Sequence, residues 1–231
     1  MNSYIKIFNA NLKDFLRNKK VILWIFVFPV CFLFLFDLII NNELKVINFD
    51  YILPWILALT LMQLGFWGGL HFLRLQRRSI ISELSVTPLS YNLLLSTNIL
   101  IKIMVALFQS VIIILMGVIF SDFNLVGNLI QFFLIIILGA LLFLSFGYMV
   151  NFFAENRERG KSLVYIVQIF MIIFSGLVFQ VDIMPSFMQS VAKILPLTSL
   201  ADLLRQVILR VPGNFPMEVN ILILFLWQIF T

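Results

Sequence analysis

Residues 21–40 read VILWIFVFPVCFLFLFDLII, and Asp37 is the only charged side chain among them. As an α-helix, these 20 residues would measure about 30 Å, the thickness of the hydrocarbon core of a membrane. About twenty mixed residues precede the run, and the run is longer than the apolar core of a secretory signal peptide. We therefore interpret residues 21–40 as a retained transmembrane helix.

The composition of the whole chain agrees with this interpretation. Of its 231 residues, 62% are hydrophobic and 12% are charged, whereas a soluble domain carries about 25% charged residues. These values exclude a soluble enzyme, a nucleic-acid-binding domain and a disordered chain. The single cysteine, Cys31, cannot form an internal disulfide.

Further apolar runs follow the first. They cover residues 52–73, 93–120, 129–153, 162–181 and 219–231. All but the last are long enough to span a membrane. The last has 13 residues, which rise only about 20 Å. We expect the natural chain to continue, with a helix that stops inside the bilayer as the alternative. The sequence thus predicts an all-α polytopic membrane protein with a single transmembrane domain over residues 1–231. Helices one to five lie within 21–181, and an incomplete sixth begins at 219.

Two segments flank these spans. Residues 2–20 place apolar side chains at helical spacing opposite Lys6, Lys13 and Arg17, which predicts an amphipathic helix in the membrane interface. Residues 182–218 contain four prolines and two short apolar stretches, too short to span. We interpret this segment as short re-entrant helices in the outer leaflet, with an ordinary surface loop as the alternative.

The distribution of Lys and Arg predicts the orientation of the chain. Eleven cations would lie on the side of the N-terminus and four on the other side. The eleven are Lys6, Lys13, Arg17, Lys19, Lys20, Arg74, Arg77, Arg78, Arg157, Arg159 and Lys161; the four are Lys45, Lys193, Arg205 and Arg210. Because cytoplasmic loops are enriched in Lys and Arg, the N-terminus is expected in the cytoplasm and the chain in the cytoplasmic membrane.

Polar side chains within the spans are costly in lipid and are candidates for a transport pathway or for helix packing. They are Gln63, Gln109, Asn151 and Gln168. Lys102 is expected to extend its ammonium to the membrane surface. The close spacing of Gly65, Gly68 and Gly69 predicts close helix approach, at a subunit interface.

Several motifs occur in a characteristic order. Residues 77–90 read RRSIISELSVTPLS; later come FSGLVF at 174–179, MP at 184–185, ILPLT at 194–198 and DLLR at 202–205. Together with the topology, they resemble the membrane subunit of type-2 ABC exporters over nearly the whole chain. Ile81-Ser82 stands where drug-exporting members usually have Gly-Thr.

The resemblance implies two membrane subunits, as a homodimer or heterodimer, and cytoplasmic ATPase subunits that bind ATP and Mg²⁺. This chain has no phosphate-binding loop and no cofactor of its own, so it is not expected to be an enzyme. A short helix ending at Pro88 would couple it to the ATPase. The implied coupling residues are Ser82, Glu83, Leu84, Val86, Thr87 and Pro88.

Two further groups of residues belong to this interpretation. A second cytoplasmic contact would comprise Glu155, Arg157, Glu158 and Arg159, with a solvated turn as the alternative. The outer re-entrant segment is marked by Gly176, Pro185, Pro196, Asp202 and Arg205.

The function predicted is that of a permease subunit of an ATP-driven exporter working by alternating access. Its nearly uncharged spans suit an amphipathic or apolar substrate, such as a drug, a peptide antibiotic or a lipid-linked molecule. Its partners would be the ATPase, a second permease subunit and membrane lipids, and no nucleic acid. A secondary transporter is the main alternative, and a membrane-embedded lipid-modifying enzyme is a more distant one.

Overall fold

The computed structural model describes residues 2–17, 19–34, 49–77, 91–121, 126–154, 156–176, 181 and 184–231. Within these ranges every regular element is a helix, as the sequence predicts. The elements are α1 (Asn2–Arg17), α2 (Lys19–Ile22), η1 (Leu23–Val27), α4 (Phe49–Arg77), α6 (Tyr91–Ser121), α7 (Leu129–Phe152), α8 (Arg157–Phe174), α9 (Ser186–Ile194), α10 (Pro196–Leu209) and α11 (Met217–Phe230).

Three of the described helices are long and apolar enough to cross a membrane. The candidate spans are Ile52–Leu70, Asn92–Ile119 and Leu129–Phe152. The apolar helices Ile25–Phe34 and Met217–Phe230 are shorter. A membrane protein is therefore confirmed, and the count of six spans stays a prediction.

One helix boundary differs from the apolar run. The sequence predicts a span over residues 162–181, but α8 begins at Arg157 and ends at Phe174. Gly176 follows with φ of +90°, a backbone conformation that favours glycine and commonly terminates helices. The apolar composition therefore continues past the point where backbone geometry ends the helix.

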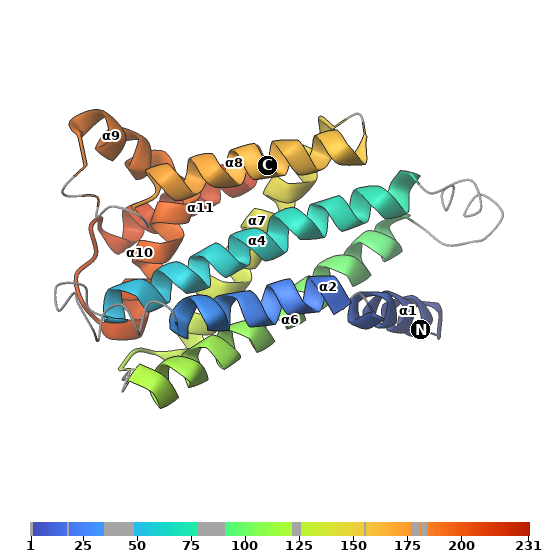
Figure 1. Cartoon of the computed structure of the whole chain (residues 1–231), viewed down its shortest axis with the longest axis horizontal. Coiled ribbons are helices and arrows are strands. Elements are labelled where there is room, and N and C mark those ends of the chain that lie inside the picture. Colours follow the sequence, from blue (N-terminus) through green and yellow to red (C-terminus); the bar gives the residue numbers. More distant parts are fainter. Residues whose placement is uncertain are drawn as a thin grey trace.

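The helices run lengthwise and define two ends of the bundle (Figure 1). At one end lie α1, the end of α4, the start of α6 and the turn between α7 and α8; we call it the α1 end. At the opposite end, the α9 end, lie α9, α10, the start of α4 and the end of α8. Segments far apart in the sequence thus meet at each end.

The core of the bundle is a close crossing of α4 and α7. A Cβ added to Gly65 would run into the backbone of Phe143, and one added to Gly69 into the carbonyl group of Gly147. Glycine is therefore required for the two backbones to approach this closely. The predicted role at a subunit interface was wrong for this pair, because both glycines contact a helix of the same chain.

Helix α10 is enclosed by protein. All residues from Pro196 to Leu204 are buried, as are Val207 and Ile208. It packs against α4, α7, α9 and α11, and its partly exposed residues are Arg205, Gln206 and Leu209. An ordinary surface loop is thereby excluded for this stretch, and its depth in the membrane stays a prediction.

The glycine crossing makes a prediction about stability. Gly69→Ala should lower the free energy of unfolding by about 1–3 kcal/mol or more, since the new methyl group would meet backbone that cannot turn aside. Gly68→Ala is the matched control, because its Cβ would meet only the side-chain ends of Leu144 and Lys102. Thermal unfolding in detergent measures both variants, and equal losses would contradict the assignment.

Candidate functional site

The predicted coupling residues Ser82, Glu83, Leu84, Val86, Thr87 and Pro88 lie outside the described residues. The helices on either side of them are described. Helix α4 ends at Arg77 and α6 begins at Tyr91, both at the α1 end of the bundle (Figure 1). The two helix ends that flank the predicted coupling residues therefore lie at the same end of the bundle.

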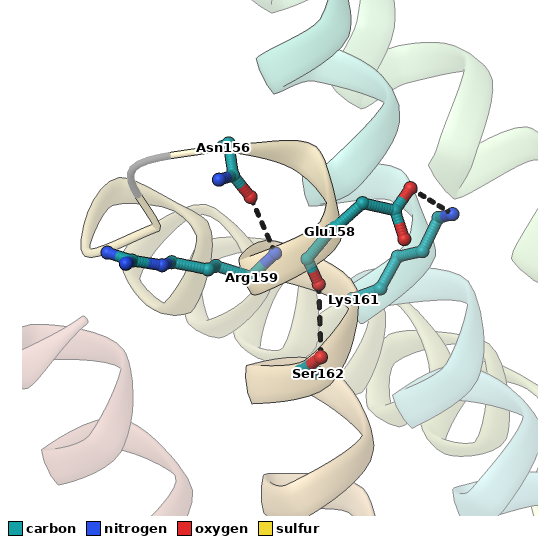
Figure 2. A network of polar contacts seen from close by, with 5 residues as sticks. All are labelled: Asn156, Glu158, Arg159, Lys161 and Ser162. Atoms are coloured by element: carbon teal, nitrogen blue, oxygen red, sulfur yellow. Dashed lines mark hydrogen bonds and ion pairs between the residues drawn. The ribbon is translucent and has the colours of Figure 1, made fainter.

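The turn between α7 and α8 lies at the same end and has a well-defined polar structure (Figure 2). The side-chain oxygen of Asn156 accepts a hydrogen bond from the Arg159 backbone N–H at 2.8 Å, which caps the start of α8. Lys161 Nζ pairs with Glu158 Oε1 at 2.7 Å, and Ser162 Oγ donates to the Glu158 carbonyl oxygen at 3.1 Å. The local contacts thus order the first two turns of α8.

This turn contains the second predicted cytoplasmic contact. Glu158 is 79% exposed even though it pairs with Lys161, and Arg159 is also exposed. Glu155 and the side chain of Arg157 lie outside the described part of the chain. The described residues form a rigid, charged corner whose acidic group lies near the positive end of the α8 dipole. Such a corner suits a protein contact as well as a solvated turn.

The polar residues predicted within the spans occupy different environments. Gln109 and Asn151 are buried and donate to backbone: Gln109 Nε2 to the Ile25 carbonyl at 2.7 Å, and Asn151 Nδ2 to the Gly147 carbonyl at 2.6 Å. Gln168 is buried as well, and Gln63 is partly exposed. None of the hydrogen bonds of the described residues joins two of these four side chains.

Lys102 lies beneath helix α1. It is only 4% exposed, and its ammonium lies 4.2 Å from the centre of the Phe15 ring, a cation–π contact. Asp14, next to Phe15 in α1, interacts with it electrostatically. The amphipathic helix α1 therefore covers Lys102, and the expected extension of its ammonium to the membrane surface stays a prediction.

At the α9 end, Asp202 joins α10 to the start of α11. Its Oδ1 accepts from the Asn214 backbone N–H at 2.8 Å; its Oδ2 accepts from the Phe215 backbone N–H at 3.1 Å, Gln206 Nε2 at 3.0 Å and Asn220 Nδ2 at 2.7 Å. The carboxylate is 2% exposed. A carboxylate offers about four acceptor positions, so this one side chain holds the returning loop and both helices.

The other residues predicted in this segment lie around that junction. Pro185 precedes the first residue of α9, and Pro196 is the first residue of α10, where its missing N–H costs no helical hydrogen bond. Arg205 is partly buried on α10, and Gly176 follows the end of α8. The sequence predicts a role for Asp202 but not for Gln206 and Asn220. Their contacts with Asp202 depend on how the loop between α10 and α11 folds back.

Comparison with known proteins now decides the family. The model described as ABC-2 type transporter matches residues 3–209. The chain belongs to the ABC-2 type transporter family. Such a permease is a membrane transport component and is not itself catalytic. The resemblance to type-2 ABC exporters seen in the sequence is therefore confirmed.

Two relatives are similar over most of this chain. One is a Bacillus subtilis (strain 168) protein named as a transport permease, YvfS, which is 23% identical over 195 residues, 81% of this chain and 78% of the relative. The other is an Escherichia coli (strain K12) protein named as a multidrug ABC transporter permease, YbhR. It is 24% identical over 179 residues, 74% of this chain, and the match spans about half of the relative, 49%.

The Asp202 junction can be tested by an isosteric change. Asp202→Asn would turn one acceptor oxygen into an amide that faces a donor, so it should destabilise the protein by about 1–3 kcal/mol. Asn214→Ala is the matched control, because Asn214 donates through its backbone and keeps the bond. Thermal unfolding measures the effect, and an unchanged Tm for Asp202→Asn would contradict the assigned role.

Proposed function

We propose that this chain is the permease subunit of an ATP-driven exporter in the cytoplasmic membrane of a bacterium. The observation that carries the proposal is the match of the ABC-2 type transporter model to residues 3–209. That match covers α1 to α10, so both the α1 end and the enclosed helix α10 belong to the family's domain.

A separate ATPase subunit supplies the work in this proposal. The phosphate-binding loop requires Gly-x-x-x-x-Gly-Lys-Ser/Thr. Gly160, Lys161 and Ser162 reproduce only its second half, and Glu155 stands at the position of the first glycine. Moreover, Gly160–Ser162 lie inside helix α8, where the backbone N–H groups are not free to cradle phosphates. ATP and Mg²⁺ therefore bind in the partner.

The α1 end of the bundle faces the cytoplasm in this proposal. The first turns of α8 carry Arg159 and Lys161, and α1 carries Lys6, Lys13 and Arg17. The helix ends that flank the predicted coupling residues, the end of α4 and the start of α6, also lie there (Figure 1). Retention of cations on the cytoplasmic side supports this orientation, and it places both predicted ATPase contacts on the same side. Helices α9 and α10 then lie toward the outer leaflet.

The substrate proposed is an amphipathic or apolar molecule moved outward by alternating access between two permease subunits. The three candidate spans contain one charged side chain, Lys102, and so offer few fixed counter-ions for a strongly charged cargo. The multidrug name of the Escherichia coli relative agrees with this substrate class. Drugs, peptide antibiotics and lipid-linked molecules remain the candidate members of the class.

The proposal is tested by purifying the chain from its native membrane in mild detergent and reconstituting the recovered complex in liposomes. We expect a nucleotide-binding subunit in stoichiometric amount, and ATP-dependent efflux of ethidium as an amphipathic aromatic probe. A variant of the ATPase lacking its phosphate-loop lysine is the control and should abolish efflux. Recovery of the chain without a nucleotide-binding subunit would contradict an ATP-driven role and favour a secondary transporter.

Substitution of the predicted coupling glutamate should separate ATP hydrolysis from export. Loss of a charge-assisted contact costs about 1.5–3 kcal/mol, so Glu83→Ala is expected to lower export about 10- to 100-fold while hydrolysis continues. Export and hydrolysis are measured on the same liposomes. Unchanged export per ATP would refute the coupling role of this residue.

The turn between α7 and α8 provides the comparison for Glu83→Ala. Arg159→Glu reverses an exposed charge and should also lower export if the turn contacts the ATPase. Asn156→Ala removes the helix cap without altering the charge of the turn, so it controls for local unfolding. Equal export by the Arg159→Glu variant and the wild type would show that the turn is solvated and does not contact the ATPase.

A further inference from the structure

The first membrane segment contains a widened helical turn followed by a proline. Residues Leu23–Val27 form a π-helix, and the backbone N–H of Phe28 donates to the Leu23 carbonyl, five residues back. Pro29 follows directly, is buried, and lies within the apolar helix Ile25–Phe34. Prolines and π-turns are the features at which helices kink, and single π-turns are frequent at functional positions.

The π-turn and Pro29 together remove the α-helical donors of the carbonyls of residues 24 and 25, because the Phe28 N–H is turned to Leu23. In α-helical register the backbone N–H of residue 29 would donate to the carbonyl of residue 25, but proline has no N–H. Gln109 of α6 supplies the missing donor, because its Nε2 lies 2.7 Å from the Ile25 carbonyl oxygen. Gln109 is 2% exposed and Ile25 is 7% exposed, so the bond is buried inside the bundle.

The Gln109 amide is directed specifically at the Ile25 carbonyl of the first segment. Ser110, the neighbour of Gln109, donates to the carbonyl of Leu107 in its own helix, whereas the Gln109 amide crosses to another helix 84 residues away in sequence. Gln109 Oε1 has no hydrogen-bond partner among the described residues. Among the described residues, the Gln109 side chain therefore hydrogen-bonds only to the Ile25 carbonyl, whose α-helical donor would be residue 29.

The donor belongs to a different helix, and this has a consequence for movement. An ordinary helical bond joins residues of one helix, whereas this bond depends on the position of the first segment relative to α6. The contact between the Phe26 and Phe108 rings, 5.8 Å between centroids at 71°, adjoins the same region and is apolar, so it tolerates sliding.

We propose that residues 23–29 are a hinge of the first membrane segment and that Gln109 is the positioning residue that holds this hinge in its observed state. The inference rests on the proposed function, since it assigns the hinge to the conformational change of an ATP-driven exporter. During that change the bond between Gln109 and Ile25 is released, and the π-turn takes up the change in direction.

A double-variant cycle tests the hydrogen bond without any assumption about transport. Gln109→Leu should lower the Tm of the purified complex by about 2–6 °C, because it leaves the Ile25 carbonyl buried and unpaired. Pro29→Ala restores the backbone donor, so adding Gln109→Leu to it should cost almost nothing. Ser110→Ala is the matched control and should behave alike in both backgrounds. Equal losses for Gln109→Leu in both backgrounds would overturn the assignment of Gln109.

A spectroscopic measurement tests the hinge itself. Cys31 is the single cysteine of the chain, is exposed, and lies just beyond Pro29, so it accepts a nitroxide label when the ATPase is cysteine-free. In the wild-type complex we expect the electron paramagnetic resonance spectrum to change on addition of ATP and vanadate. In Pro29→Ala this change should be lost, while the Tm stays at or above the wild-type value.

The outcomes separate this inference from the proposed function. A wild-type complex that hydrolyses ATP, together with a Pro29→Ala complex that keeps the full spectral change, overturns the hinge and leaves the exporter role intact. A wild-type complex that neither binds an ATPase nor hydrolyses ATP overturns the exporter role. In that case the Tm cycle still decides whether Gln109 replaces the donor that Pro29 lacks.

Discussion

The close contact between α4 and α7 is the constraint on which the other packing depends. Gly65, Gly69 and Gly147 allow backbone to touch backbone, and a methyl group at any of them would meet main-chain atoms. Helices in lipid gain little from apolar burial, so their association depends on dispersion contacts that require such proximity. Helix α4 also contacts α6, α8 and α10, and α7 contacts α6, α8, α10 and α11. The position of the crossing therefore sets the position of every neighbour.

The second constraint is the pairing of polar groups where water is excluded. The bundle meets it with side chains from other elements at points where a helix cannot satisfy its own backbone. Gln109 serves the Ile25 carbonyl beside Pro29, Asp202 serves the N–H groups of the 214–215 turn, and Trp227 Nε1 donates to the Ile194 carbonyl at the end of α9, at 2.8 Å. Each bond replaces a missing local partner, and each joins two elements.

These constraints divide the molecule into a packed body and two distinct ends. The α1 end combines a covered lysine, Lys102, with the capped and charged first turns of α8 (Figures 1 and 2). The α9 end is organised around one buried carboxylate. The match to the ABC-2 type transporter model over residues 3–209 includes both ends. In our proposal, the helices that join the two ends transmit the work of the ATPase from the α1 end to the α9 end.

The membrane environment, the helical class, the family and the identity of the unusual polar residues follow from the order of amino acids. Apolar run length and motif order are local properties, and a charged or amide side chain in an apolar run is conspicuous without a structure. The partners of those side chains do not follow from it. Gln109 bonds across 84 residues, Asp202 collects donors from a loop 12–18 residues away, and Lys102 is covered by Phe15 of α1. Such contacts arise only when helices pack, because geometry in three dimensions rather than spacing along the chain chooses the donor for each acceptor.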